Sequence, residues 1–177
     1  MGYREMRNHS GAETGCGDSE NLLRYKVFVK KSQKVIIMNI QGYEFPDDLY
    51  YDKNHYWARI EDDAVVIGAT DFTQKLAGEF VFVELPYEGD TVEQGKPFAT
   101  IESGKWTGRI YAPVSGEIIE VNEDLEDDYT MINKDPYGEG WIVKVSPSNL
   151  DADLKNLLHE KADMEAFIKK EIEQHVK

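Results

Sequence analysis

Short runs of β-branched and aromatic residues, separated by glycine, proline and acidic turns, dominate residues 45–145 of this chain. Clear examples are residues 80–85, which end at Pro86, and residues 117–121 and 141–145. Runs of this length bounded by turn residues are typical of strands. Many short strands at such spacing indicate a flattened barrel or sandwich. The sequence therefore predicts a mainly β domain.

Two segments depart from this pattern and predict helices. Thr70 is a suitable N-cap and Gly78 a suitable stop, so residues 70–78 predict a short helix. In residues 148–177 leucine, isoleucine and phenylalanine recur near helical spacing, with charged residues between them. This tail predicts one or two helices, with a bend around residues 162–163, whose apolar face packs on the β domain.

The chain divides into three parts on composition. Residues 1–40 form an extension of different charge, of which residues 1–20 are polar and without periodicity, as in disordered segments. Residues 25–38 contain two apolar runs around a polar gap, which fit either a β-hairpin or a single unpaired segment. Residues 41–147 form the β domain, and residues 148–177 form the helical tail.

One lysine stands at the tip of a predicted hairpin. Strand-like residues lead into and out of the polar turn around Lys105, and Gly104 and Gly108 bracket it. A lysine on a tight turn is a long flexible amine held clear of the protein. Such a side chain suits the attachment of a tethered cofactor, and it is equally what an ordinary solvated turn contains.

The charge of the chain excludes one class of partner. The formal net charge is -14 at pH 7, and the acidic excess lies beyond the first 37 residues. A phosphate backbone repels such a body, so nucleic acid is not an expected ligand. No apolar run approaches the length that spans a membrane, and the N-terminus does not resemble a secretion or transit signal. We therefore expect a cytoplasmic protein that acts away from membranes.

Catalytic and metal-binding patterns are not evident in the sequence. The four histidines are scattered, and the acidic run at residues 123–128 lacks the spacing of a calcium loop. Cys16 is the single cysteine, so it cannot form an internal disulfide. We expect a monomeric protein without catalytic residues or a metal site.

A series of motifs, in order, carries a resemblance to a known family. The motifs are His55-x-Trp57, 67–72, 81–86, Gly89, Glu102-Ser103-x-Lys105, 111–116, 121–122, 132–141 and Lys144. Together they resemble the glycine cleavage system H protein, a lipoyl carrier, from residue 50 to residue 144. The resemblance implies a lipoyl-type barrel-sandwich hybrid with lipoate in amide linkage to Lys105. It also places Glu102, Ser103 and, after the hairpin, Gly116 in the lipoyl-attachment pattern, where Glu102 would help a lipoyl-attaching enzyme to find the tip.

The family resemblance implies a carrier, not an enzyme. A lipoyl arm in this family shuttles an aminomethyl intermediate from glycine between glycine decarboxylase, an aminomethyltransferase and lipoamide dehydrogenase. Because the intermediate stays attached to such an arm, it reaches each enzyme without diffusing freely between them.

The chain departs from the family pattern around the expected resting groove of the arm. We expect His55, Tyr56, Trp106 and Arg109 to line this groove. Tyr56 and Arg109 stand where the resembling proteins carry carboxylates, and Arg109 would repel a protonated amine. Trp106 suits either stacking on the arm or cross-strand packing.

These departures leave two alternatives to glycine cleavage. One is a lipoate-binding carrier of a heterodisulfide-reductase-like sulfur-oxidation pathway, which would serve sulfur-pathway enzymes. The other is a lipoyl relay or a non-catalytic scaffold.

Overall fold

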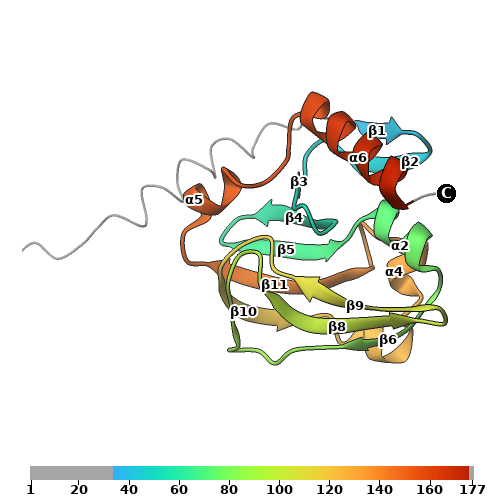
Figure 1. Ribbon diagram of the computed structural model, residues 1–177. Coiled ribbons are helices and arrows are strands. Elements are labelled where there is room, and N and C mark those ends of the chain that lie inside the picture. The colour runs from blue at the N-terminus through green and yellow to red at the C-terminus, as the bar shows by residue number, and fades with distance from the viewer. Residues whose placement is uncertain (1–33, 176–177) are drawn as a thin grey trace, which may run out of the picture. The chain divides into compact units, whose positions relative to one another are not determined.

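The computed structural model of this chain describes residues 34–175. The strands are β1 Ile37–Ile40, β2 Tyr43–Pro46, β3 Tyr50–Tyr51, β4 Tyr56–Glu61, β5 Ala64–Ala69, β6 Phe80–Glu84, β7 Thr91–Val92, β8 Pro97–Ser103, β9 Trp106–Tyr111, β10 Gly116–Val121 and β11 Trp141–Pro147. The helices are α2 Asp71–Ala77, α3 Asp124–Asp127, α4 Met131–Lys134, α5 Leu150–Leu154 and α6 Lys161–His175. The predicted mainly β fold with a helical tail is confirmed (Figure 1).

Two sheets face each other and enclose the larger core. The first has six strands in the order β3-β4-β5-β11-β10-β7, and the second has three in the order β6-β8-β9. Ile67 of β5, Ile101 of β8, Ile110 of β9 and Val145 of β11 are buried in one cluster between them. The layers are those of a flattened sandwich that is not closed into a barrel (Figure 1).

A second core covers the other face of the six-stranded sheet. The hairpin of β1 and β2 and the helix α6 lie over this face (Figure 1). Trp57 of β4 and Val66 of β5 are buried there with Met164 and Ile168 of α6. Because side chains alternate across a strand, β5 buries both of its faces, which explains its almost wholly apolar sequence.

The N-terminal hairpin extends the fold beyond the predicted start of the domain. Strand β1 precedes residue 41 and pairs with β2, and it buries Met38 and Ile40. Residues 25–33 of the predicted hairpin, like Cys16, lie outside the described residues.

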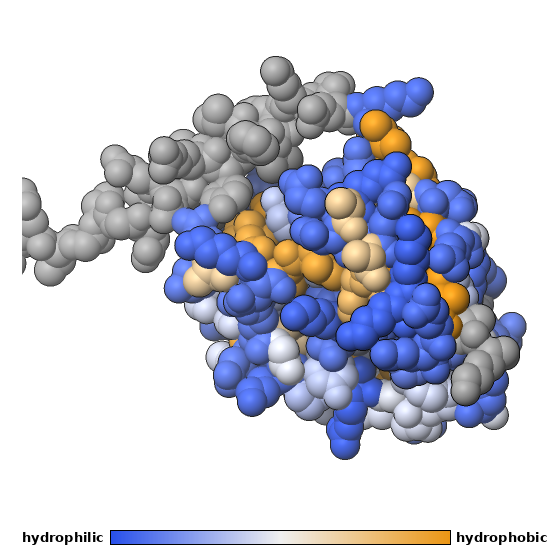
Figure 2. Space-filling view, turned by 45° about the horizontal axis from the view of Figure 1, so that its top comes forward, coloured by the Kyte–Doolittle hydropathy of each residue, from blue (hydrophilic) through white to orange (hydrophobic). Residues whose placement is uncertain are grey.

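The tail forms two helices, but they separate earlier than the predicted bend at residues 162–163. Helix α5 ends at Leu154 and α6 begins at Lys161. Between them, Leu158 and Tyr51 exchange two backbone hydrogen bonds of 2.8 Å, which hold the connecting segment as an extra bridge on β3. Met164 and Ile168 pack α6 on the domain, as its apolar spacing predicts. On the outer surface of the molecule around α6, hydrophilic side chains predominate, with apolar patches between them (Figure 2).

Candidate functional site

Lys105 occupies a two-residue turn between β8 and β9. The antiparallel register ends at the pair Ser103 and Trp106, so Gly104 and Lys105 alone form the turn. Both turn residues are exposed. Within residues 34–175, the Lys105 ammonium makes no hydrogen bond and no ion pair. The hairpin therefore presents a lysine whose terminal nitrogen is free to react.

The stem of Lys105 lies over the glycine that ends α2. A Cβ atom at Gly78 would come within 3.3 Å of Lys105 Cε and 3.9 Å of Nζ. Gly78 has φ +83°, a conformation that L side chains rarely adopt, and its N–H donates to Gln74 O. Gly78, which ends the helix as the sequence predicts, thus also lies beneath the lysine.

Ser103 fastens the hairpin to the end of α2. Its buried hydroxyl donates a 2.6 Å hydrogen bond to Ala77 O, and Lys105 N donates to the same hydroxyl at 3.4 Å. Glu102 pairs in register with Phe82 of β6 and Thr107 of β9. Among the described residues, the Glu102 carboxylate has no hydrogen-bond or ion-pair partner, so it is available to a visiting protein.

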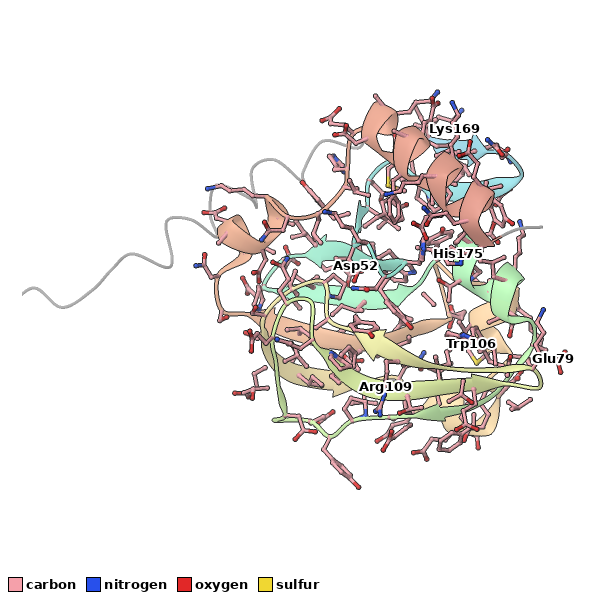
Figure 3. The ribbon with its side chains drawn as sticks, viewed as in Figure 1. Asp52, Glu79, Trp106, Arg109, Lys169 and His175 are labelled. Carbon is pink, nitrogen blue, oxygen red and sulfur yellow. The ribbon has the colours of Figure 1, made fainter. Side chains whose placement is uncertain are left out.

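Trp106 packs on its own strand and not across the hairpin. Its ring occupies the place where a Cβ atom of Gly108 would lie. Trp106, Gly108 and Ile110 share one face of β9, and Ile110 is buried in the core. Trp106 therefore lies on the inward side of β9 at the open end of the sandwich, with 41% of its surface exposed (Figure 3).

Tyr56 and Arg109 meet, but through a main-chain carbonyl. The buried Tyr56 hydroxyl donates a 2.9 Å hydrogen bond to Arg109 O, and burial raises the pKa of Tyr56. Arg109 itself is exposed, and its Nη1 lies 3.5 Å from Thr100 Oγ1. Since strand side chains alternate, Arg109 and Trp106 project from opposite faces of β9. These two side chains cannot line one side of a groove together.

His55 lies beneath α6 and away from the lysine turn. Its Nε2 is 3.1 Å from Glu171 Oε2, and its ring is stacked with Phe167 of α6 and packs on Phe72 of α2. Burial lowers the pKa of His55. The structure thus places this predicted groove residue in the interface that holds the C-terminal helix.

Gly116 begins β10, at the end of the sandwich opposite the lysine turn (Figure 1). It pairs with Val92 on one side and Pro147 on the other. A Cβ atom here would collide with Ser146 O, so the glycine allows two strands to approach closely. Of the predicted site residues, the structure brings Glu102, Ser103, Lys105 and Trp106 together and places Gly116 elsewhere.

Comparison with known proteins supports the family resemblance along most of the chain. The family model of the glycine cleavage H-protein matches residues 49–171. The chain belongs to the glycine cleavage H-protein family. A probable glycine cleavage system H protein of Thermococcus gammatolerans is 47% identical over 134 residues, which cover 75% of this chain and 96% of the relative. The H protein of Bacteroides fragilis is 46% identical over 114 residues, which are 64% of this chain and 90% of the relative.

A solved H-protein structure shares the fold. The crystal structure of a glycine cleavage system H protein from Mycobacterium marinum is 38% identical, with a TM-score of 0.57, and the match covers 59% of this chain and 87% of that one. H proteins are lipoyl carriers and not catalysts. These relatives do not favour the sulfur-pathway alternative.

The H-protein lysine turn fits a covalently attached lipoyl group. An amide bond at Lys105 needs an accessible, unengaged amine, and the exposed Nζ supplies one. In the part of the chain that the structure describes, no group of three or more His, Cys, Asp or Glu side chains could hold a metal ion. Among the described helices none is long and apolar enough to cross a membrane.

Gly78 beneath the lysine, and Asn133 that bonds Gly78, are not among the site residues predicted from the sequence. Gly78 was assigned only to the end of a helix, and Asn133 only to a family motif. Asn133 Nδ2 donates to Gly78 O at 2.9 Å, while its Oδ1 accepts from Phe80 N at 2.9 Å. Asn133 stands inside one family motif, after Ile132 and before Asp135, and its partner Gly78 lies 55 residues away.

Proposed function

We propose that this chain is the lipoyl carrier of a glycine cleavage system, with lipoate attached to Lys105. The observation that carries the proposal is the free, exposed amine on a two-residue turn, next to the buried anchor Ser103. The family membership supports the choice of cofactor. The remainder of the domain supports this turn at its base through Ser103 and Gly78.

An attached lipoyl group supplies a dithiolane that accepts an aminomethyl group derived from glycine. The chain itself positions that arm. Amide formation removes the charge of the lysine, so the arm leaves the turn as a neutral, flexible chain. The Ser103 hydroxyl keeps the base of the arm in one place, which raises the effective concentration of the arm at a docked partner.

The partners in this proposal are glycine decarboxylase, the aminomethyltransferase, lipoamide dehydrogenase and a lipoyl-attaching enzyme. A net charge of -14 favours fast, salt-sensitive encounters with basic surfaces on these larger proteins. The unpartnered Glu102, three residues before the lysine, lies where the attaching enzyme must approach.

Intact mass spectrometry tests the proposal. The full chain is incubated with a lipoate ligase, lipoate and ATP, alongside Lys105→Arg and the control Lys96→Arg, which changes an exposed lysine at the other end of β8. We expect one lipoyl group on the wild type and on the control, and none on Lys105→Arg. A lipoyl group on Lys105→Arg, or none on the wild type, contradicts the proposed site.

A second step tests the cargo. Lipoylated protein is incubated with glycine decarboxylase and glycine. Carbon dioxide leaves, the dithiolane opens, and the protein should gain the mass of methylamine, as an aminomethyl group on one sulfur and a hydrogen on the other. Lipoylated protein that stays unloaded while another H protein is loaded under the same conditions contradicts the glycine assignment and leaves the lipoyl site intact.

A further inference from the structure

The connection between α2 and β6 receives contacts from both the lysine hairpin and α4. Ser103 Oγ donates to Ala77 O on one side. On the other side, the Asn133 side chain bonds Gly78 O and Phe80 N, each at 2.9 Å. Backbone groups of Ala77, Gly78 and Phe80 are thus held by side chains from two other elements.

Asn133 is suited to this task because its amide has both a donor and an acceptor. The donor satisfies a carbonyl at the end of α2, and the acceptor satisfies the first N–H of β6. The same Nδ2 also lies 3.4 Å from Gln74 Oε1. An alanine would leave both backbone groups without these partners and would release the connection from α4.

Gly78 forms the surface on which the lysine stem rests. Its φ of +83° and ψ of -166° lie in a region used almost only by glycine. A side chain would also press on Lys105 Cε, since even its Cβ atom would stand at 3.3 Å. The backbone conformation therefore favours glycine at this position, and even a methyl group here would make the lysine stem move slightly.

We propose that Asn133 and Gly78 are positioning residues that set how Lys105 is presented to the lipoyl-attaching enzyme. This inference rests on the proposed function. A lysine on an open turn samples many rotamers, and an acyl-transfer enzyme reacts only with those that reach its activated lipoyl group. The glycine surface, held in place by Asn133, restricts the stem to one side of the turn. Neither residue takes part in the reaction itself.

The test measures lipoylation kinetics on the full chain. The variants are Asn133→Ala and Gly78→Ala, with Asn156→Ala as the matched control, because Asn156 is exposed and bonds Gln94. We expect kcat for Asn133→Ala to fall at least fivefold with KM within twofold, since the docking surface is unchanged. The control should match the wild type. Wild-type kcat in Asn133→Ala contradicts the inference.

Chemical acylation shows whether a variant changes the positioning of Lys105 or only its accessibility. An acetyl N-hydroxysuccinimide ester acylates accessible lysines without recognising the fold, and peptide mass spectrometry gives the rate at Lys105. We expect this rate to stay within twofold in both variants. A chemical rate that falls as far as the enzymatic rate means that the substitution merely hides the lysine, which overturns the inference.

The second variant protects the test against a folding failure. If circular dichroism shows that Asn133→Ala is unfolded, the lipoylation kcat of Gly78→Ala is measured instead, because this variant retains the Asn133 side chain. A folded Gly78→Ala with wild-type kcat then overturns the inference. Failure of the proposed function looks different, because the wild type would itself remain unlipoylated.

Discussion

Two turns of this protein, residues 52–55 and residues 104–105, have opposite designs. In the first, Asp52 is 6% exposed, and its carboxylate accepts hydrogen bonds from Asn54 N at 2.9 Å and Tyr56 N at 2.8 Å. A third, from Asn54 Nδ2, is 3.1 Å long. Helix α6 covers the end of this turn through His55. The side chains of Asp52, Asn54 and His55 are thus all engaged.

The second turn is almost unsupported by comparison. Gly104 and Lys105 are exposed, and the anchor is the single hydroxyl of Ser103. The difference teaches that the fold binds the side chains of the first turn into the protein, whereas it anchors only the base of the second turn, through Ser103, and leaves the Lys105 amine free. Stability and carrier function are thus assigned to separate turns, and changes at one should spare the other.

Removal of the Asp52 carboxylate should give the largest effect on stability. Asp52→Ala leaves buried N–H groups of the turn without acceptors, and we expect a loss of about 2–4 kcal/mol in the free energy of unfolding. Urea denaturation measures the loss. Asp52→Asn retains an acceptor oxygen at the same place and should lose clearly less.

Asp52→Ala also tests whether the two turns act independently. Below its unfolding transition, Asp52→Ala should be lipoylated at the wild-type rate. A fall in that rate as large as the one expected for Asn133→Ala would show that the two turns do not act independently.

The pH dependence of stability tests whether the buried Asp52 carboxylate titrates in the folded protein. Burial raises the pKa of Asp52 to about 6, above the value in the unfolded chain. The folded state therefore holds this proton more tightly, and the stabilisation is fully present below the unfolded pKa and is lost as the pH rises through about 6. A shift of this size corresponds to roughly 2–3 kcal/mol.

Urea titrations of the wild type and Asp52→Asn at several pH values between about 4 and 7.5 isolate this effect. The wild type should lose stability relative to Asp52→Asn as the pH rises. His55, whose lowered pKa acts in the opposite direction, is common to both proteins and cancels. A difference between the two proteins that does not vary with pH would contradict the buried, titrating carboxylate.

The contact between Trp106 and Gly108 should give the smallest effect, on the exposed hairpin. Gly108→Ala forces the partly exposed ring to move, and we expect a cost of about 1 kcal/mol. In the background Trp106→Ala the same change should be neutral or slightly stabilising, because alanine suits a strand better than glycine. A double-mutant cycle by urea denaturation measures the coupling. Additive effects would show that the ring does not rest on Gly108.

Features set by near neighbours could be predicted from the sequence. The short helix begins after Thr70, whose hydroxyl accepts from Thr73 N, and it ends at Gly78, as its residues indicate. The lysine turn was evident because the strands that form it are adjacent in the chain. The family motifs added the expected cofactor and fold.

Long-range contacts determined the rest. The bond between His55 and Glu171 spans 116 residues, and the bond between Asn133 and Gly78 spans 55. Neither partner carries a local signal for the other, because each pair meets only when separate elements pack together. Alternation along β9 likewise separates Trp106 from Arg109, although both were expected in one groove. The chain thus specifies its lysine turn locally, whereas the surface beneath that lysine exists only once α2, α4 and β8 have packed.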